Sequence, residues 1–194
     1  MRKNKFLILL FAAMMILIIP GGCSNPDSSK ISLRFDIFGN YTGFKNLPKT
    51  YTVEQAEADG CYVIKDLHLI GGAAAWEEFK EKSSSGINSG LRIVTFSNTY
   101  IRFTYLFYQD GSYRAFSSEK SIFSRHNDLK DHPFSILLEL EDRLSDSAAI
   151  NGVMVIITDD PALTYHDIFS IIVSSDFGYA GRLSPFNYVF DIYF

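Results

Sequence analysis

The stretch LRIVTFSNTYIRFTYLFYQDGSYRAF, residues 91–116, decides the fold. It is rich in the β-branched and aromatic residues that are typical of strands, and Asp110-Gly111 supplies the positive-φ pair of a two-residue hairpin turn. The pattern predicts an antiparallel meander of three strands, over residues 91–97, 100–108 and 112–116. Both faces of the middle strand carry aromatic rings, and one of them must form the core. We expect the second face to be covered; the alternative is that it presents rings to a peptide, a glycan or a partner protein.

Upstream of the meander, the pattern predicts a strand and a short helix. Apolar and polar residues alternate over residues 31–37, which indicates a half-buried strand. Thr52 and Gln55 form a capping box, in which each side chain accepts a hydrogen bond from a backbone N–H of the first helical turn. Gly60 is placed to end this helix.

A further strand and helix are predicted before the meander. Residues 61–70 are predicted to form one strand. Residues 73–83 have helical periodicity, with Trp76 as the expected core anchor and Glu78 placed to form an ion pair with Lys82 four residues later.

Downstream of the meander, residues 117–132 are polar and are expected to form a long loop. Residues 134–144 fit either a helix or a strand, and the alternation of apolar residues favours a strand. Residues 153–158 are predicted to form a buried strand.

The C-terminal part is predicted to contain a helix and a last strand. Thr164 and Asp167 mark the start of the helix. Residues 186–192 alternate as in a strand, which we expect to pair with residues 31–38. The whole pattern predicts an α+β fold, with an antiparallel sheet, a central meander and two to three packed helices.

Residues 1–22 are predicted to be a lipoprotein signal peptide. Three basic residues precede an apolar run over residues 6–19, which is shorter than the roughly 20 residues of a membrane-spanning helix. Gly21 and Gly22 before Cys23 resemble the bacterial lipoprotein signal, in which that cysteine is lipidated and becomes the new N-terminus. Pro20 departs from the pattern, and an uncleaved signal anchor is the alternative. We expect Cys23 to carry a diacylglyceryl group and palmitate, because two or more acyl chains make a lasting anchor.

Removal of this leader leaves a polar tether, residues 23–30, and a single domain, residues 31–194. It also changes the formal net charge from −4 to −7, since the leader holds three basic residues and no acidic one. An acidic surface without clustered Lys or Arg excludes nucleic acid as a partner. With Cys23 acylated, Cys61 has no disulfide partner, and its apolar neighbours predict a buried, inert thiol.

Four segments occur in an order that resembles a known family: YTVEQAEADGCYVI at 51–64, WEEF at 76–79, LRIV at 91–94 and YQDG at 108–111. The chain is similar here to an uncharacterised family of bacterial lipoproteins, domain of unknown function 4362. The resemblance covers about residues 50–116. It implies export, a lipid anchor and a mixed helix and sheet domain, and it supplies no catalytic residues.

The strongest candidates for chemistry lie in the polar loop. Imidazole and carboxylate groups suit zinc or manganese, and the loop holds His126, Asp128, Asp131 and His132. Lys130 would repel a cation there, and a solvated loop explains the same residues. Ser117 and Lys120 match the Ser-x-x-Lys pattern of serine acylases, whose accompanying motifs the sequence lacks.

The remaining histidines, His68 and His166, are expected to be exposed rather than catalytic. We therefore expect a non-catalytic binding or envelope-accessory module without a cofactor, at the outer side of a Gram-positive-type cell membrane. Its expected partners are the membrane, through Cys23, and an envelope protein or peptide. The alternatives are an extracytoplasmic metal-dependent or serine hydrolase, and a signalling lipoprotein with a membrane partner.

Overall fold

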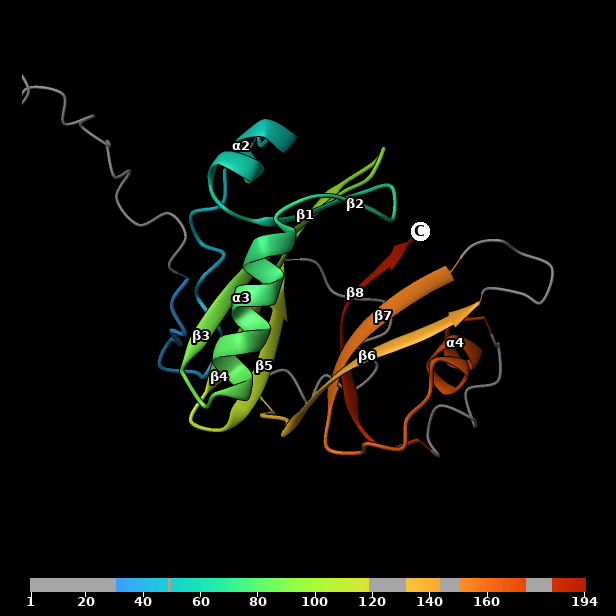
Figure 1. The fold of residues 1–194 in the computed structure, drawn as a ribbon. Coiled ribbons are helices and arrows are strands. Elements are labelled where there is room, and N and C mark those ends of the chain that lie inside the picture. Colours follow the sequence, from blue (N-terminus) through green and yellow to red (C-terminus); the bar gives the residue numbers. More distant parts are fainter. Residues whose placement is uncertain (1–30, 49, 119–131, 144–150, 174–182) are drawn as a thin grey trace, which may run out of the picture.

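Three helices and eight strands make up the described part of the chain, which confirms the predicted α+β class (Figure 1). The computed structural model describes residues 31–48, 50–118, 132–143, 151–173 and 183–194. The predicted leader, Cys23 and most of the polar loop lie outside these residues. The elements are α2 (Val53–Ala58), β1 (Tyr62–Lys65), β2 (His68–Gly71), α3 (Ala73–Ser84), β3 (Ser89–Phe96), β4 (Ile101–Gln109), β5 (Ser112–Ser117), β6 (Ile136–Arg143), β7 (Asn151–Thr158), α4 (Tyr165–Val173) and β8 (Phe186–Tyr193).

A five-stranded sheet contains the predicted meander. Its strand order is β2-β1-β3-β4-β5, and β3, β4 and β5 pair antiparallel as expected. Asp110 and Gly111 have φ values of 52° and 81°, which confirms the predicted positive-φ turn. β1 and β3 run parallel instead, because α3 carries the chain back across the sheet between them.

The single strand predicted over residues 61–70 is wrong, because the chain reverses in the middle of it. β1 and β2 form a hairpin, with Lys65 opposite His68. Its two turn residues, Asp66 and Leu67, have φ values of 48° and 68°. Leucine is unusual in this conformation, and the turn is held by non-local contacts, since Tyr193 N donates to Leu67 O at 2.8 Å.

A three-stranded antiparallel sheet, β6-β7-β8, forms the second half of the fold. It confirms the strand interpretation of residues 134–144 and the strands predicted over residues 153–158 and 186–192. The expected pairing of the last strand with residues 31–38 is wrong, because β8 pairs with β7.

Residues 31–48 do not form the predicted strand. Within them, the sole bridge pairs Phe35 with Tyr41. Their apolar side chains pack instead on the outer face of the five-stranded sheet, against Phe103, Tyr105 and Phe107 of β4. The second face of β4 is therefore buried as expected, and the alternative of exposed rings on it is wrong.

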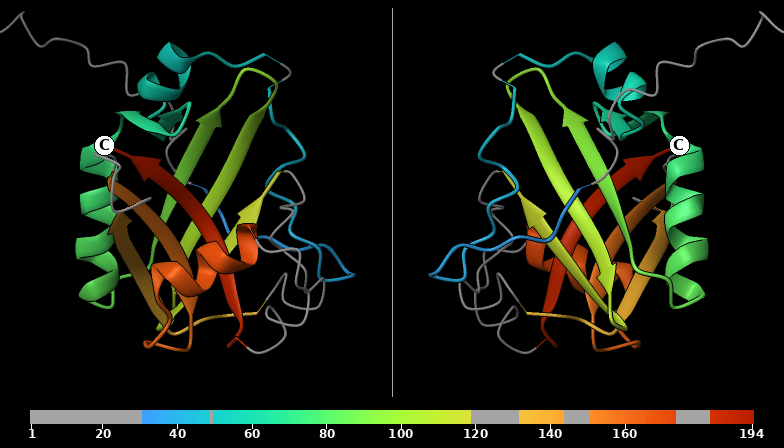
Figure 2. Two further views of the ribbon diagram at one scale, coloured as in Figure 1. Left: turned by 90° about the vertical axis from the view of Figure 1, so that its right-hand side faces the viewer. Right: turned by 90° about the vertical axis from the view of Figure 1, so that its left-hand side faces the viewer.

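The main core lies between the two sheets and α3, and strands of the two sheets cross at an angle (Figure 2). Trp76 is buried there, as predicted. Lys80 lies 5.4 Å from the Trp76 ring centroid and forms ion pairs with Glu77 (3.1 Å) and with Glu139 of β6 (3.0 Å). Lys80 thereby links α3 to the second sheet. α4 packs on the outer face of that sheet.

The predicted helix signals are confirmed at atomic detail. Thr52 Oγ1 accepts from Gln55 N at 3.3 Å, and Gln55 Oε1 accepts from Thr52 N at 2.9 Å. Gly60, with φ 69°, ends α2, and Gly60 N and the following N–H bond back to the helix in a Schellman motif. Thr164 and Asp167 cap α4 in the same reciprocal way.

Candidate functional site

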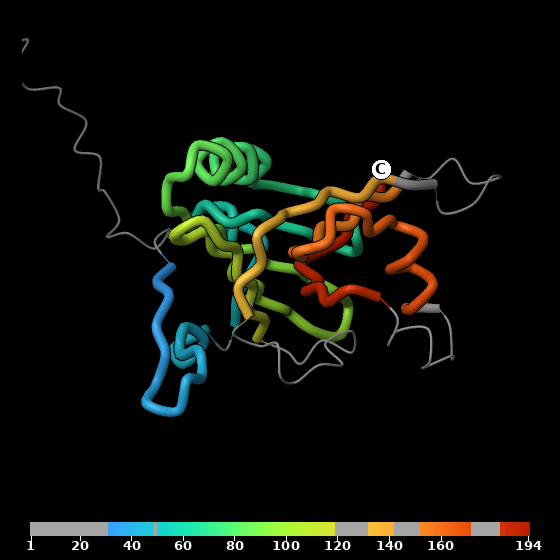
Figure 3. Tube along the Cα trace, turned by 90° about the horizontal axis from the view of Figure 1, so that it is seen from below, coloured from blue at the N-terminus to red at the C-terminus, as the bar shows by residue number. Residues whose placement is uncertain are grey.

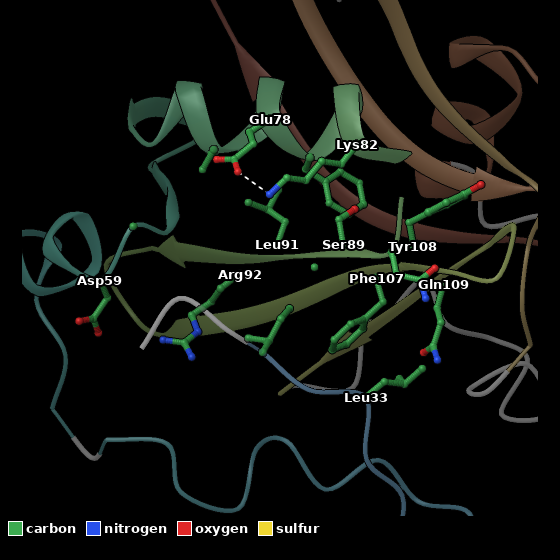
Figure 4. A pocket seen from close by; sticks show the side chains of 16 residues that line it. Leu33, Asp59, Glu78, Lys82, Ser89, Leu91, Arg92, Phe107, Tyr108 and Gln109 are labelled. Carbon is green, nitrogen blue, oxygen red and sulfur yellow. Dashed lines mark hydrogen bonds and ion pairs between the residues drawn. The ribbon is translucent and has the colours of Figure 1, made fainter. Parts of the chain in front are cut away.

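A groove of about 670 Å³ lies between α3 and the N-terminal half of β3 (Figure 4). This volume is in the range of sites that take small molecules or a short stretch of peptide. We call it the β3 groove. Its main walls come from α3, from β3 and from residues 31 and 33, and the Asp59-Gly60 turn lies at one end.

The floor of the β3 groove is an unpaired strand edge. β1 is four residues long and pairs with β3 only from Ile93 to Phe96. The preceding stretch, Ser89 to Arg92, pairs with β4 on one side and, among the described residues, with no strand on the other. The edge is therefore open over the four residues of β3 that precede the start of β1.

Backbone geometry identifies the free groups on this edge. The N–H and C=O of one strand residue point to the same side, and the side alternates along the strand. Phe96 O accepts a hydrogen bond from Asp66 N, on the β1 side. The backbone N–H and C=O groups of the even-numbered residues of β3 therefore point toward the β1 side. Beyond the start of β1, the N–H and C=O of Gly90 and the N–H of Arg92 point into the groove.

The two walls of the groove differ in chemistry. Ser89 and Leu91 point toward α3, where Glu78 and Lys82 form an ion pair at 2.5 Å (Figure 4). The wall on the other face holds the apolar Ile31 and Leu33 together with the cationic Arg92, and it lies close to the strand. A Cβ placed on Gly90 would lie 2.9 Å from Ile31 Cγ1, so the glycine lets residue 31 pack directly against β3.

Arg92 is the cation of the groove that has no anionic partner. Its guanidinium lies 5.3 Å from the ring centroid of Tyr105. Among the described residues, no carboxylate forms an ion pair with it, and its Nε is buried without a hydrogen-bond partner. Ser89 Oγ is likewise buried and unpaired. Unsatisfied buried donors are costly, and both of these line the groove.

Near Arg92, the thiol of Cys61 and the phenol of Tyr51 stay protonated and therefore carry no charge. Cys61 is fully buried, as predicted, and this burial raises the pKa of its thiol. Burial and a 2.6 Å hydrogen bond from its hydroxyl to Asp59 raise the pKa of Tyr51. The carboxylate of Asp59 is thus engaged by a neutral donor within its own end of the groove.

Of the four candidate metal ligands that the sequence offered beside the solvated-loop interpretation, the structure describes His132. His126, Asp128 and Asp131 lie outside the described residues. His132 Nε2 is 3.4 Å from Asp159 Oδ2, a residue that the sequence did not single out. Within the described ranges, no three His, Cys, Asp or Glu side chains gather as a metal site would require.

Asp159 also accepts hydrogen bonds from the N–H and the hydroxyl of Ser135, both at 2.8 Å. Serine, histidine and aspartate therefore meet here, but their hydrogen bonds do not connect them in the way that nucleophilic catalysis requires. A triad needs the imidazole on the serine hydroxyl, whereas Ser135 and His132 both bond to the carboxylate. This cluster ties the start of β6 to the end of β7.

Replacing Asp159 by asparagine is expected to lower the free energy of unfolding at pH 7 by at most about 1 kcal/mol, because more than half of the side chain is exposed. Hydrogen bonds lower the pKa of Asp159. The largest effect comes from the N–H of Ser135, followed by the Ser135 hydroxyl and by His132. Its stabilising effect is therefore present above its unfolded pKa of about 4 and is lost as the pH falls through the lower folded pKa. Urea unfolding at pH 7 and at low pH measures this, and an equal difference at both would contradict it.

The other sequence candidates do not form a site in the described residues. Ser117 Oγ is buried without a hydrogen-bond partner, and Lys120 lies outside the described residues. His68 and His166 are exposed as predicted. His68 Nδ1 lies 3.0 Å from Tyr193 O, where it joins β2 to β8.

Sequence reasoning missed the β3 groove. The signal that points to it is a mismatch of length, since β1 has four residues and β3 has eight. The prediction of one long strand over residues 61–70 hides this mismatch.

No protein-family model, curated protein or solved structure matches this chain. None of the helices in the described ranges has the length and apolar character needed to cross a bilayer. The geometry of the β3 groove is therefore the basis for a functional proposal.

Proposed function

We propose that this protein is a lipid-anchored, extracytoplasmic binding module whose β3 groove takes an extended peptide segment of an envelope partner. The single observation that carries this proposal is the open edge at residues 89–92, with backbone groups of Gly90 and Arg92 directed into a groove. An extended peptide satisfies such groups by adding a strand to the sheet.

The dimensions of the edge suit a short stretch of peptide. Four strand residues span about 13 Å, and β1 blocks further pairing at Ile93. Successive side chains of an added strand would point alternately to the two walls. One set would meet Ala75 and Phe79 of α3, and the other set would meet Leu33 and Arg92.

The positive charge of Arg92 favours a peptide that carries an acidic residue. A carboxylate on the side of Arg92 would supply the anion that this guanidinium lacks, in a charge-assisted hydrogen bond. Apolar side chains suit the opposite wall, beside Phe79. The expected ligand is thus an extended segment in which an acidic residue lies next to apolar ones.

The anchor is the second part of the proposal, and it is supported by the leader and by Cys23. Mass spectrometry of the protein isolated from cells tests it. We expect an N-terminal, acylated Cys23, in line with the resemblance to the lipoprotein family. An intact residue 1 with an unmodified thiol would contradict the anchor and would leave the groove as a separate question.

Random eight-residue peptides displayed on phage supply a probe for the groove. We expect the peptides selected on the full chain to be enriched in Asp or Glu beside apolar residues. Arg92→Gln is expected to weaken their binding about 10- to 100-fold, the loss typical of a hydrogen bond to a charged group. Titration of synthetic copies of the selected peptides measures this loss.

A steric pair of variants separates the groove from the rest of the surface. Ser89→Tyr places a ring in the groove and is expected to abolish binding, whereas Ser84→Tyr, at an exposed position of α3, should leave binding unchanged. Thermal unfolding confirms that each variant is folded. Peptides that bind Arg92→Gln and Ser89→Tyr as tightly as the unmodified protein would contradict the proposed site.

A further inference from the structure

A loop near the start of the described chain exposes two large apolar side chains. Ile37 is 92% exposed and Phe38 is 81% exposed, more than any other large apolar residue in the described ranges. Residues 31–48, drawn in blue, extend at the outer edge of the molecule in Figure 3. Adjacent, largely exposed apolar side chains favour contact with another apolar phase.

The 36–40 loop has a defined conformation that holds these side chains outward. Asp36 Oδ1 accepts from the N–H groups of Phe38 and Asn40, both at 2.9 Å, and Asp36 N donates to Asn40 O at 2.9 Å. Gly39, with φ 78°, completes the turn. The loop therefore presents its apolar pair on an ordered support.

The base of the loop is fixed to the five-stranded sheet. The Tyr41 ring stacks on Phe116 at 4.2 Å, and the Phe35 ring meets the same residue edge-on at 5.8 Å. Thr42 N bonds to Arg34 O at 2.9 Å across the base. The loop is therefore held in a fixed position on the five-stranded sheet.

We propose that the 36–40 loop inserts Ile37 and Phe38 into the outer leaflet of the membrane that holds Cys23. This inference rests on the anchor of the proposed function. Fourteen residue steps separate Cys23 from Ile37, and an extended chain spans about 3.3–3.6 Å per residue. The tip therefore lies within roughly 50 Å of the anchored residue along the chain and can reach the same leaflet.

The charges around the tip suit the membrane interface. The exposed side chains of Arg34 and Lys45 flank the loop, and long cationic side chains extend readily to headgroups. Asp36, the acidic residue of the loop, is engaged in the hydrogen bonds that form it. Ile37, Phe38 and Gly39 at the tip itself carry no charge.

Insertion would also set the orientation of the β3 groove. Residues 31 and 33, which line the groove, precede the tip on the same segment. A lipid chain on a flexible tether leaves a domain free to turn, whereas a second contact through a fixed loop restricts it. The groove would then face a constant direction relative to the membrane surface.

The test uses the acylated full chain, purified from cells and reconstituted into phosphatidylcholine vesicles. Ile37→Trp adds a fluorophore at the tip, and Glu81→Trp adds one at an exposed position of α3. Trp76 is buried and gives the same background in both. Brominated phosphatidylcholine quenches tryptophan that reaches the acyl chains. An inserted apolar segment lies about 5–10 Å deep, at the boundary between headgroups and acyl chains.

We expect the added emission of Ile37→Trp to be blue-shifted and quenched by brominated lipid, and that of Glu81→Trp to be unaffected by it. The further change Phe38→Ser should reduce the quenching. Equal emission with and without bromine, on protein whose Cys23 is acylated, would overturn the insertion and leave the anchor intact.

Two other results would overturn the proposal in distinguishable ways. A blue shift that disappears when the protein is diluted in the vesicles would show that the loop contacts a second protein molecule instead of lipid. A chain without acyl groups on Cys23 would overturn both the anchor and the insertion that depends on it.

Discussion

Replacing Phe190 by alanine is expected to lower the free energy of unfolding by about 3–5 kcal/mol, the range for removing a buried aromatic ring. Phe190 belongs to β8 and is 1% exposed. Its ring centroid lies 5.0 Å from that of Tyr62 on β1 and 5.3 Å from that of Trp76 on α3. One side chain therefore connects both sheets and α3, and its loss leaves a cavity at the point where they meet.

Phe194→Ala is the matched control, because it removes the same ring four residues later at a position that is 67% exposed. Its effect is expected to stay within about 0.5 kcal/mol. Urea unfolding, followed by Trp76 fluorescence and by circular dichroism, measures both variants. A small effect of Phe190→Ala, or separate transitions by the two probes, would contradict a core shared by the two sheets.

The second large effect is expected at Gly72, where α3 begins. Gly72 has φ 79°, and a Cβ there would lie 2.0 Å from Cys61 O. Gly72→Ala combines about 1–2 kcal/mol for the left-handed backbone with about 1–3 kcal/mol for crowding in a packed site. The obstacle is a backbone carbonyl, which cannot rotate away as a side chain does.

Gly86→Ala separates the backbone cost from the steric cost. Gly86 follows the other end of α3 and has φ 73°, and a Cβ placed on it would have no neighbouring atom within 4 Å. It is expected to lose about 1–2 kcal/mol, the backbone cost alone. Equal losses for the two variants in thermal and urea unfolding would show that Gly72 does not approach Cys61 O closely enough to exclude a Cβ.

The close approach of Gly72 to Cys61 also affects the β3 groove. Gly72 sets the distance between α3 and β1, and α3 forms one wall of the groove. A shift of α3 away from Cys61 would widen the groove beside Gly60. Variants at Gly72 are therefore expected to affect peptide binding as well as stability, whereas variants at Gly86 should affect stability alone.

Local patterns predicted most of the regular structure correctly. The meander followed from strand-forming residues around Asp110-Gly111, and the helix starts at Thr52 and Thr164 followed from reciprocal side-chain caps. The alternation in residues 134–144 also favoured the strand that the structure contains. In each case, the deciding interactions join residues close together in sequence.

Non-local packing decided the elements that were predicted wrongly. The turn at Asp66 and Leu67 has no glycine to mark it. Apolar and polar residues alternate over residues 31–37, but this segment is not a strand. Its apolar side chains pack instead on a sheet formed by other residues. His132 meets Asp159, 27 positions later, because β6 and β7 pair in a particular register. None of these contacts has a local signature.

The sequence by itself determined the helix caps, the hairpin turn and the strands of the meander, because each depends on neighbouring residues. Only the tertiary structure decided that β1 begins opposite Ile93, four residues after the start of β3, that Arg92 lies there without a carboxylate, and that Ile37 and Phe38 remain outside the core. These features depend on which strands pair and where the pairing stops. That outcome reflects the packing of the whole chain, and no short segment encodes it.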